Sequence, residues 1–140
     1  MATSRHLWTR DLLASLLVPG SLQNTLALVA QIQAEGGGAL FNPLNTTLPM
    51  PGATDYNSVH VKNYLTYEQG ITATANTLRQ ANMSLLLDAL KKADSAKGYW
   101  LALAESPWGT SPPGGMTIDA FLADIRTHWM QRVMIPIAGT

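Results

Sequence analysis

The chain has 140 residues, 46% of them hydrophobic, which is enough for one compact domain with a buried core. Nine basic residues balance nine acidic ones, so the composition provides no excess of positive charge for nucleic acid or for an anionic membrane surface. The absence of cysteine excludes disulfides, thiolate metal ligands and cysteine nucleophiles. An uncharged polymer such as a glycan fits this charge balance better than an anionic partner.

The N-terminal region is not expected to act as a signal peptide. Its apolar stretch is interrupted by Thr9, Arg10 and Asp11. No segment of the sequence approaches the roughly 20 apolar residues that are needed to span a bilayer. We therefore expect a soluble protein that does not insert into a membrane.

Two helices are predicted first in the chain. Apolar residues recur at helical spacing over residues 7–17, and Pro19 with Gly20 ends this segment. Ser21 is a candidate N-cap for a second helix that runs to Glu35, where Gly36, Gly37 and Gly38 stop it.

Residues 39–63 show no helical period. Prolines, glycines and several Asn and Thr residues dominate the segment, and only Val59 and Val61 alternate as they would in a strand. The pattern predicts a long loop that contains at most a minor hairpin. Loops of this length are uncommon in compact domains and often carry function.

Helices are again predicted for the rest of the chain. Thr66 and Gln69 form a capping-box pattern that opens one helix, and two more are expected over residues 84–92 and 99–104. After a connector rich in Pro and Gly, Thr117 caps an amphipathic helix with an apolar stripe that reaches Trp129. The apolar tail at residues 133–137 is expected to pack on the domain or onto a partner.

Together these elements predict an all-α fold with one long loop after the second helix. We expect a helical domain over residues 1–115. Residues 116–140, the C-terminal amphipathic helix and the apolar tail, could then act as an assembly element.

Glu35 is the strongest candidate for a catalytic acid. It lies at the C-terminal end of a predicted helix, where the negative end of the helix dipole disfavours a charged carboxylate. The neighbouring Leu40 and Phe41 add desolvation in the same direction. A carboxyl group that keeps its proton near neutral pH is what a general acid for glycoside cleavage requires. The alternative is a solvated glutamate at a helix end, without a catalytic role.

Four motifs follow one another along the chain. They are Gln33-Ala34-Glu35-Gly36-Gly37, Phe41-Asn42-Pro43-Leu44-Asn45-Thr46-Thr47, Tyr64-x-x-Tyr67-Glu68-x-Gly70-Ile71, and Ser106-Pro107-Trp108-Gly109-Thr110. In this order they resemble a lysozyme-like family of actinobacteria and their phages, and the order is also similar to that of glucosaminidases and soluble lytic transglycosylases. The resemblance covers roughly residues 8–110. It implies a small lysozyme-like helical domain with a groove in which Glu35 protonates the glycosidic oxygen between peptidoglycan sugars.

The resemblance also implies substrate-binding residues. Asn42, Asn45, Thr46 and Thr47 match the turn that lines the groove, and Tyr64 matches an aromatic residue close to the acid that steadies an oxocarbenium-like transition state. Each has a structural alternative, because Asn and Thr also bond their own backbone in turns and a tyrosine also serves in a core. Trp108 fits a plug at the end of the domain better than a sugar-stacking residue.

A glycosidase with two carboxylates needs a second acid within roughly 5 to 9.5 Å of the first. Asp55, Glu68 and Glu105 are available, but none stands in a compelling pattern. Lytic transglycosylases use a single Glu because a hydroxyl of the substrate closes on the sugar carbon, so the sequence favours that chemistry. His6, His60 and His128 lie too far apart in the chain to predict a metal site, and we expect neither a metal nor a cofactor.

We therefore expect a peptidoglycan-cleaving enzyme, a lytic transglycosylase or a muramidase or glucosaminidase, in a phage virion or at the host cell wall. The alternative is a non-catalytic structural component of a phage particle. It would contact other phage proteins or a second copy of the chain through residues 117–140. A plain glycan-binding module is a third hypothesis, which keeps the groove but does not depend on Glu35.

Overall fold

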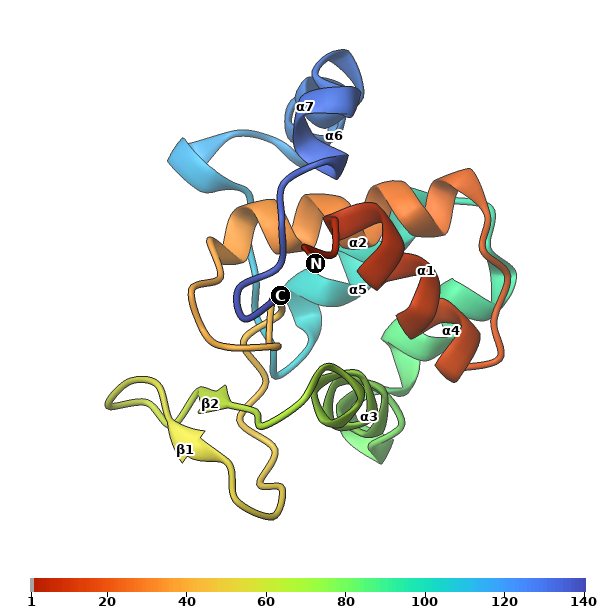
Figure 1. The fold of residues 1–140 in the computed structure, drawn as a ribbon. Coiled ribbons are helices and arrows are strands. Elements are labelled where there is room, and N and C mark those ends of the chain that lie inside the picture. Colours follow the sequence, from red (N-terminus) through yellow and green to blue (C-terminus); the bar gives the residue numbers. More distant parts are fainter. Residues whose placement is uncertain (1) are drawn as a thin grey trace.

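The computed structural model describes residues 2–140 and is mostly helical, as the sequence predicts. A two-stranded antiparallel sheet, β1 (Thr54–Asp55) with β2 (Lys62–Asn63), stands to one side of the helical body (Figure 1). The α-helices are α1 (Arg5–Ser15), α2 (Leu22–Glu35), α3 (Tyr67–Leu78), α4 (Ser84–Lys92), α5 (Ala96–Glu105), α6 (Ile118–Thr127) and α7 (Trp129–Val133). Short 3₁₀ turns, η1 (Ala81–Met83) and η2 (Pro113–Gly115), precede α4 and α6.

Side-chain caps set where most of the helices begin. The hydroxyls of Ser21, Thr66 and Thr117 each accept a hydrogen bond from the backbone N–H three residues on, as predicted. Ser4 caps α1 in the same way, so this helix begins at Arg5 and not at residue 7. Ser95 caps α5, which therefore begins three residues before the predicted Tyr99.

Two details of the predicted helices are wrong. Gln69 does not return to the N–H of its own cap residue. Its Oε1 accepts from the N–H of Leu65 at 2.9 Å, and its Nε2 donates to the Pro51 carbonyl at 2.8 Å, which ties α3 to the long loop. The predicted C-terminal helix breaks at His128, whose φ of −108° and ψ of 31° are not helical, so Trp129 begins the separate helix α7.

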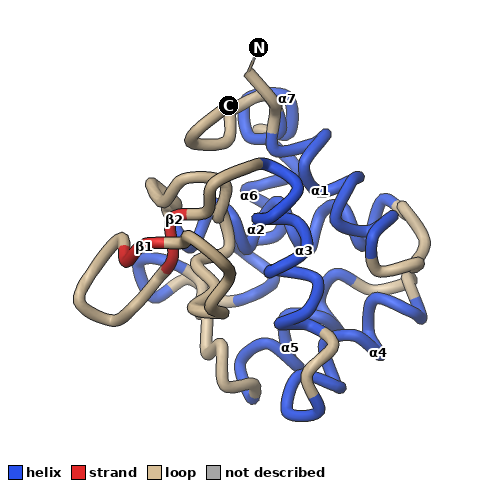
Figure 2. Tube along the Cα trace, turned by 60° about the horizontal axis from the view of Figure 1, so that its bottom comes forward, coloured by secondary structure: helices blue, strands red, loops and turns tan. Residues whose placement is uncertain are grey.

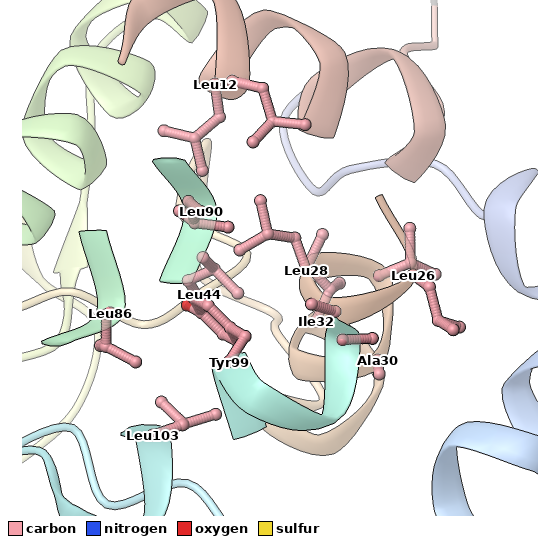
Figure 3. Packing of buried hydrophobic residues seen from close by; sticks show 14 of the residues in the cluster. Leu12, Leu26, Leu28, Ala30, Ile32, Leu44, Leu86, Leu90, Tyr99 and Leu103 are labelled. Carbon is pink, nitrogen blue, oxygen red and sulfur yellow. The ribbon is translucent and has the colours of Figure 1, made fainter. Parts of the chain in front are cut away.

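The core is built around α2, which packs against α1, α5 and α6. Leu28 and Ile32 of α2 belong to one buried cluster with Leu12 of α1 and Leu90 of α4 (Figure 3). Leu44 comes from the long loop yet is fully buried in the same cluster. Because burying a leucine is worth about 1.5–3 kcal/mol, Leu44 fastens the beginning of the long loop to the helices.

The C-terminal segment packs back on the domain, which is one of the two alternatives that the sequence left open. Phe121, Leu122 and Ile125 of α6 belong to the core cluster, and Ile137 of the tail is buried in it. The two ends of the chain lie side by side in both views (Figures 1 and 2), joined by an isolated bridge between Ser4 and Pro136. In the described part of the chain, each helix is too short or too polar to cross a membrane.

Candidate active site

A cleft of about 830 Å³ lies where the hairpin meets the helical body. Its wall is formed by the C-terminal end of α2, residues 45–49 of the long loop, and the hairpin turn. The end of α3 with the 3₁₀ turn that follows it, and the Pro107–Trp108 connector, complete the wall. Figure 1 shows the hairpin and its flanking loops to one side of the helices. Segments that are far apart in the sequence therefore share one concave surface.

Glu35 is the last residue of α2 and lies in the wall of this cleft. Gly36 adopts a left-handed conformation with φ of 68° and ends the helix there. The Thr110 hydroxyl donates to Glu35 Oε1 at 2.5 Å, and the Asn45 amide Nδ2 donates to Oε2 at 2.9 Å. Hydrogen bonds to a carboxylate are short and strong. The two donors therefore hold the carboxyl group in one orientation.

Asn45 reaches Glu35 because of the conformation of its own backbone. It is left-handed with φ of 58°, which asparagine tolerates better than most residues. Its N–H donates to the Asn42 carbonyl at 3.2 Å, and the preceding Leu44 anchors the turn in the core. The same Nδ2 also donates to the backbone carbonyl of Glu35 at 3.2 Å. Asn45 thus lines the cleft and bonds both the side chain and the backbone of the candidate acid.

Asn42 is fully buried and lies outside the cleft wall. Its Nδ2 donates to the carbonyls of Thr46 at 2.9 Å and Lys62 at 2.7 Å, and its Oδ1 accepts from the Thr46 N–H at 3.0 Å. These bonds close the turn and tie it to β2. This geometry matches the alternative in which Asn42 builds the turn.

Thr46 and Thr47 both line the cleft, but they differ in exposure. The hydroxyl of the buried Thr46 lies 2.6 Å from that of Thr77 on α3, which joins the long loop to that helix. The side chain of Thr47 is exposed. Of these two threonines, Thr47 is the one free to contact a ligand.

Tyr64 is buried in the interior and does not line the cleft. Its hydroxyl donates to the carbonyl of Leu48, a residue of the cleft wall, at 2.6 Å. Burial raises the pKa of Tyr64 to about 12. Tyr64 therefore supports the wall from the core side, in agreement with its structural alternative.

Sequence reasoning did not assign two residues of the connector to the site. Thr110 ends the Ser106–Thr110 motif, but its bond to Glu35 spans 75 residues of sequence and no local pattern predicts it. Trp108 packs partly against the core, donates from Nε1 to the Leu44 carbonyl at 2.9 Å, and also lines the cleft. The Ser106–Thr110 motif therefore contributes Trp108 to the wall of the cleft and Thr110 to the hydrogen bonds of Glu35.

Glu35 is the only ionisable residue among the described residues that line the cleft. The remaining lining presents amides, hydroxyls, and apolar groups such as Val59 and Met83. Asp55 pairs instead with Lys62 and His60 on the hairpin, and the hydrogen bond from Lys62 is the main cause that lowers its pKa. The cleft thus offers one acid in uncharged polar surroundings.

Comparison of the chain with family models, with curated proteins and with solved structures finds no match in any of the three. Within residues 2–140, no three His, Cys, Asp or Glu side chains come together in a way that could hold a metal ion. The interpretation of the cleft therefore rests on the chemistry of its own residues.

Proposed function

We propose that this chain cleaves the glycan strand of peptidoglycan, with Glu35 as its general acid. The observation that carries the proposal is a single carboxyl group, held by two donors, in a cleft otherwise lined by amide, hydroxyl and apolar groups. A sugar chain presents hydroxyl and acetamido groups, which pair with uncharged donors and acceptors of this kind. The cleft volume of about 830 Å³ is ample for several atoms on either side of a glycosidic bond.

In the first step Glu35 gives its proton to the glycosidic oxygen as the bond from C1 to that oxygen breaks. The bonding electrons stay with the leaving oxygen, and the sugar ring develops oxocarbenium-like positive charge. Glu35 becomes a carboxylate, and its negative charge stabilises the positive charge of the ring. The Thr110 hydroxyl can accept from the protonated acid and donate to the carboxylate, because a hydroxyl does both. Thr110 can therefore hold Glu35 in either state.

In the second step the hydroxyl on C6 of the same sugar attacks C1 and returns a proton to Glu35. The product carries a 1,6-anhydro ring, no water is consumed, and the acid is restored. The lining of the cleft favours this route over hydrolysis by two carboxylates, since Asp55, Glu68 and Glu105 all lie outside the cleft wall. We therefore propose lytic transglycosylase chemistry at this site.

The test is release of soluble fragments from purified peptidoglycan by the unmodified chain and by Glu35→Gln. We expect Glu35→Gln to lose at least about 100-fold in rate, because a general acid contributes roughly 10²–10⁴. The matched control is Glu105→Gln, an exposed glutamate at the end of α5, which should stay active. Equal thermal midpoints for the three proteins would establish that the folds are intact.

The outcomes separate the other hypotheses. Binding to peptidoglycan without fragment release, unchanged in Glu35→Gln, would point to a glycan-binding module. Neither binding nor release would favour a structural component of a phage particle. Equal fragment release by Glu35→Gln would overturn the assignment of the acid.

A further inference from the structure

The C-terminal residues 134–140, the C-terminal strap, contact the base of the loop that carries Asn45. The Ala138 carbonyl accepts a hydrogen bond from the Phe41 N–H at 2.9 Å. Gly139 lies against the Phe41 ring, and a Cβ built on Gly139 would come within 3.1 Å of it. Gly139 also has φ of 96°, which disfavours any other residue. The strap thus contacts both the backbone and the ring of Phe41.

The strap is fastened to the N-terminal segment along its length. The Ile137 N–H donates to the Thr3 carbonyl at 2.8 Å, and the Thr3 N–H donates to the Thr140 hydroxyl at 2.9 Å. Ile137 is 3% exposed, and the Arg5 N–H bonds the Ile135 carbonyl at 2.9 Å. These bonds hold Ala138 and Gly139 in place beside the loop.

Helix α3 contacts Phe41 at its carbonyl group. A Cβ built on Gly70 would lie 1.9 Å from the Phe41 carbonyl oxygen, so the helix backbone passes directly against this residue. Phe41 itself is left-handed with φ of 55°, a conformation that is unfavourable for a residue other than Gly, Asn or Asp. Such a conformation persists only where its surroundings impose it. Here the strap and α3 do so.

We infer that the C-terminal strap is a positioning element of the active site. By holding Phe41 left-handed, it sets the path of the turn from Asn42 to Asn45, and with it the amide that orients Glu35. Each link is a direct contact: Ala138 to Phe41, the Asn42 carbonyl to the Asn45 N–H, and Asn45 to Glu35. The effect on turnover rests on the proposed function, whereas the effect on the turn does not.

The kinetic test uses Gly139→Ala, which forces a methyl group against the Phe41 ring. We expect kcat to fall about tenfold with KM within about twofold, because a misplaced acid loses rate more than binding. The control is Gly114→Ala, which also stands at a positive φ, 64°, but has open space around its Cβ. It should change kcat by less than about twofold.

A double-mutant cycle shows whether the strap acts through Asn45. Asn45→Gly keeps the left-handed backbone but removes the amide, and Gly139→Ala added to it should cause no further loss of kcat. A strap that serves stability alone would lower activity by the same factor in both backgrounds. That second result would overturn the inference.

The side-chain amide resonances of Asn45 give a readout that does not depend on turnover. Gly139→Ala should shift them toward the values of a solvated asparagine, while Gly114→Ala leaves them in place. If the unmodified chain is inactive but this shift occurs, the proposed function is wrong and the inference about the strap is supported. If the resonances do not move, the strap inference is wrong whatever the activity.

Discussion

Three side chains carry the chemistry that we assign to the cleft. Glu35 supplies the proton, while Asn45 and Thr110 each bond one of its carboxyl oxygens, at 2.9 and 2.5 Å. The two partners differ in kind: the Asn45 amide nitrogen only donates, whereas the Thr110 hydroxyl donates or accepts. Thr110 is therefore the partner that can follow Glu35 through loss and recovery of its proton.

Thr110→Val tests that role at nearly constant volume. We expect kcat to fall about tenfold with little change in KM, since the lost bond orients the acid and does not hold the sugar. Thr110→Ser restores the hydroxyl and should recover most of the rate. Steady-state kinetics on soluble glycan strands provide the comparison, and a valine variant as fast as the unmodified chain would remove Thr110 from the mechanism.

At the scale of elements, the site depends on how closely α3 approaches the long loop. Gly70 allows this approach, since any Cβ there would overlap the Phe41 carbonyl. The Thr46–Thr77 hydroxyl pair and the bonds of Gln69 to Leu65 and Pro51 fasten the same two segments. These contacts therefore attach the wall of the cleft to α3.

Gly70→Ala is expected to lower the free energy of unfolding by about 2 kcal/mol or more, because a backbone oxygen must move to admit the methyl group. Gly20→Ala, where a Cβ meets no atom within 4 Å, should change it by less than about 1 kcal/mol. Urea unfolding of the two variants measures both values. Equal stabilities would show that the loop yields easily, contrary to the close contact with Phe41.

Sequence reasoning reached the elements whose signals are local. Ser21, Thr66 and Thr117 are predictable as caps because each is a hydroxyl residue just before a helical pattern, and each accepts a hydrogen bond from the N–H three residues on. Glu35 was singled out because a helix end and a glycine run are also local features. The partners of Glu35 are different, since the bond from Thr110 crosses 75 residues and depends on how the whole chain folds. The contact of Ala138 with Phe41 could not be predicted for the same reason.

At the scale of the whole molecule, the C-terminal segment belongs to the same folded unit as the rest. The residues of α6 share the core with α2 and α5, and the strap joins the N-terminal segment to the loop that carries Asn45. The segment that the sequence suggested as an assembly element also packs within the chain. Activity and global stability should therefore depend on both ends of the sequence.

Global stability should fall at alkaline pH. Burial raises the pKa of Tyr64 to about 12 and raises those of Tyr67 and Tyr99 above the ordinary value of 10. These tyrosines ionise near pH 10 when unfolded but keep their protons when folded. Their stabilising contribution is thus complete below pH 10 and is lost as pH rises toward 12.

We expect the free energy of unfolding to drop by about 1 kcal/mol or more between pH 10 and 11. Urea unfolding at a series of pH values measures this, with tyrosinate absorbance as an independent record of ionisation. Tyr64→Phe should make the decline shallower. A free energy of unfolding that stays level from pH 9 to 11 would contradict the burial of these hydroxyls.

In the mechanism that we propose, Glu35 alone supplies and recovers the proton for glycan cleavage. The most direct test of this mechanism is mass spectrometry of the ends formed when the unmodified chain digests purified peptidoglycan in ¹⁸O-labelled water. We expect anhydro ends without ¹⁸O from the unmodified chain, and no new ends from Glu35→Gln. Reducing ends that carry ¹⁸O would indicate hydrolysis in place of the transglycosylase step. No ends at all, on a substrate that a known lysozyme degrades, would contradict this mechanism.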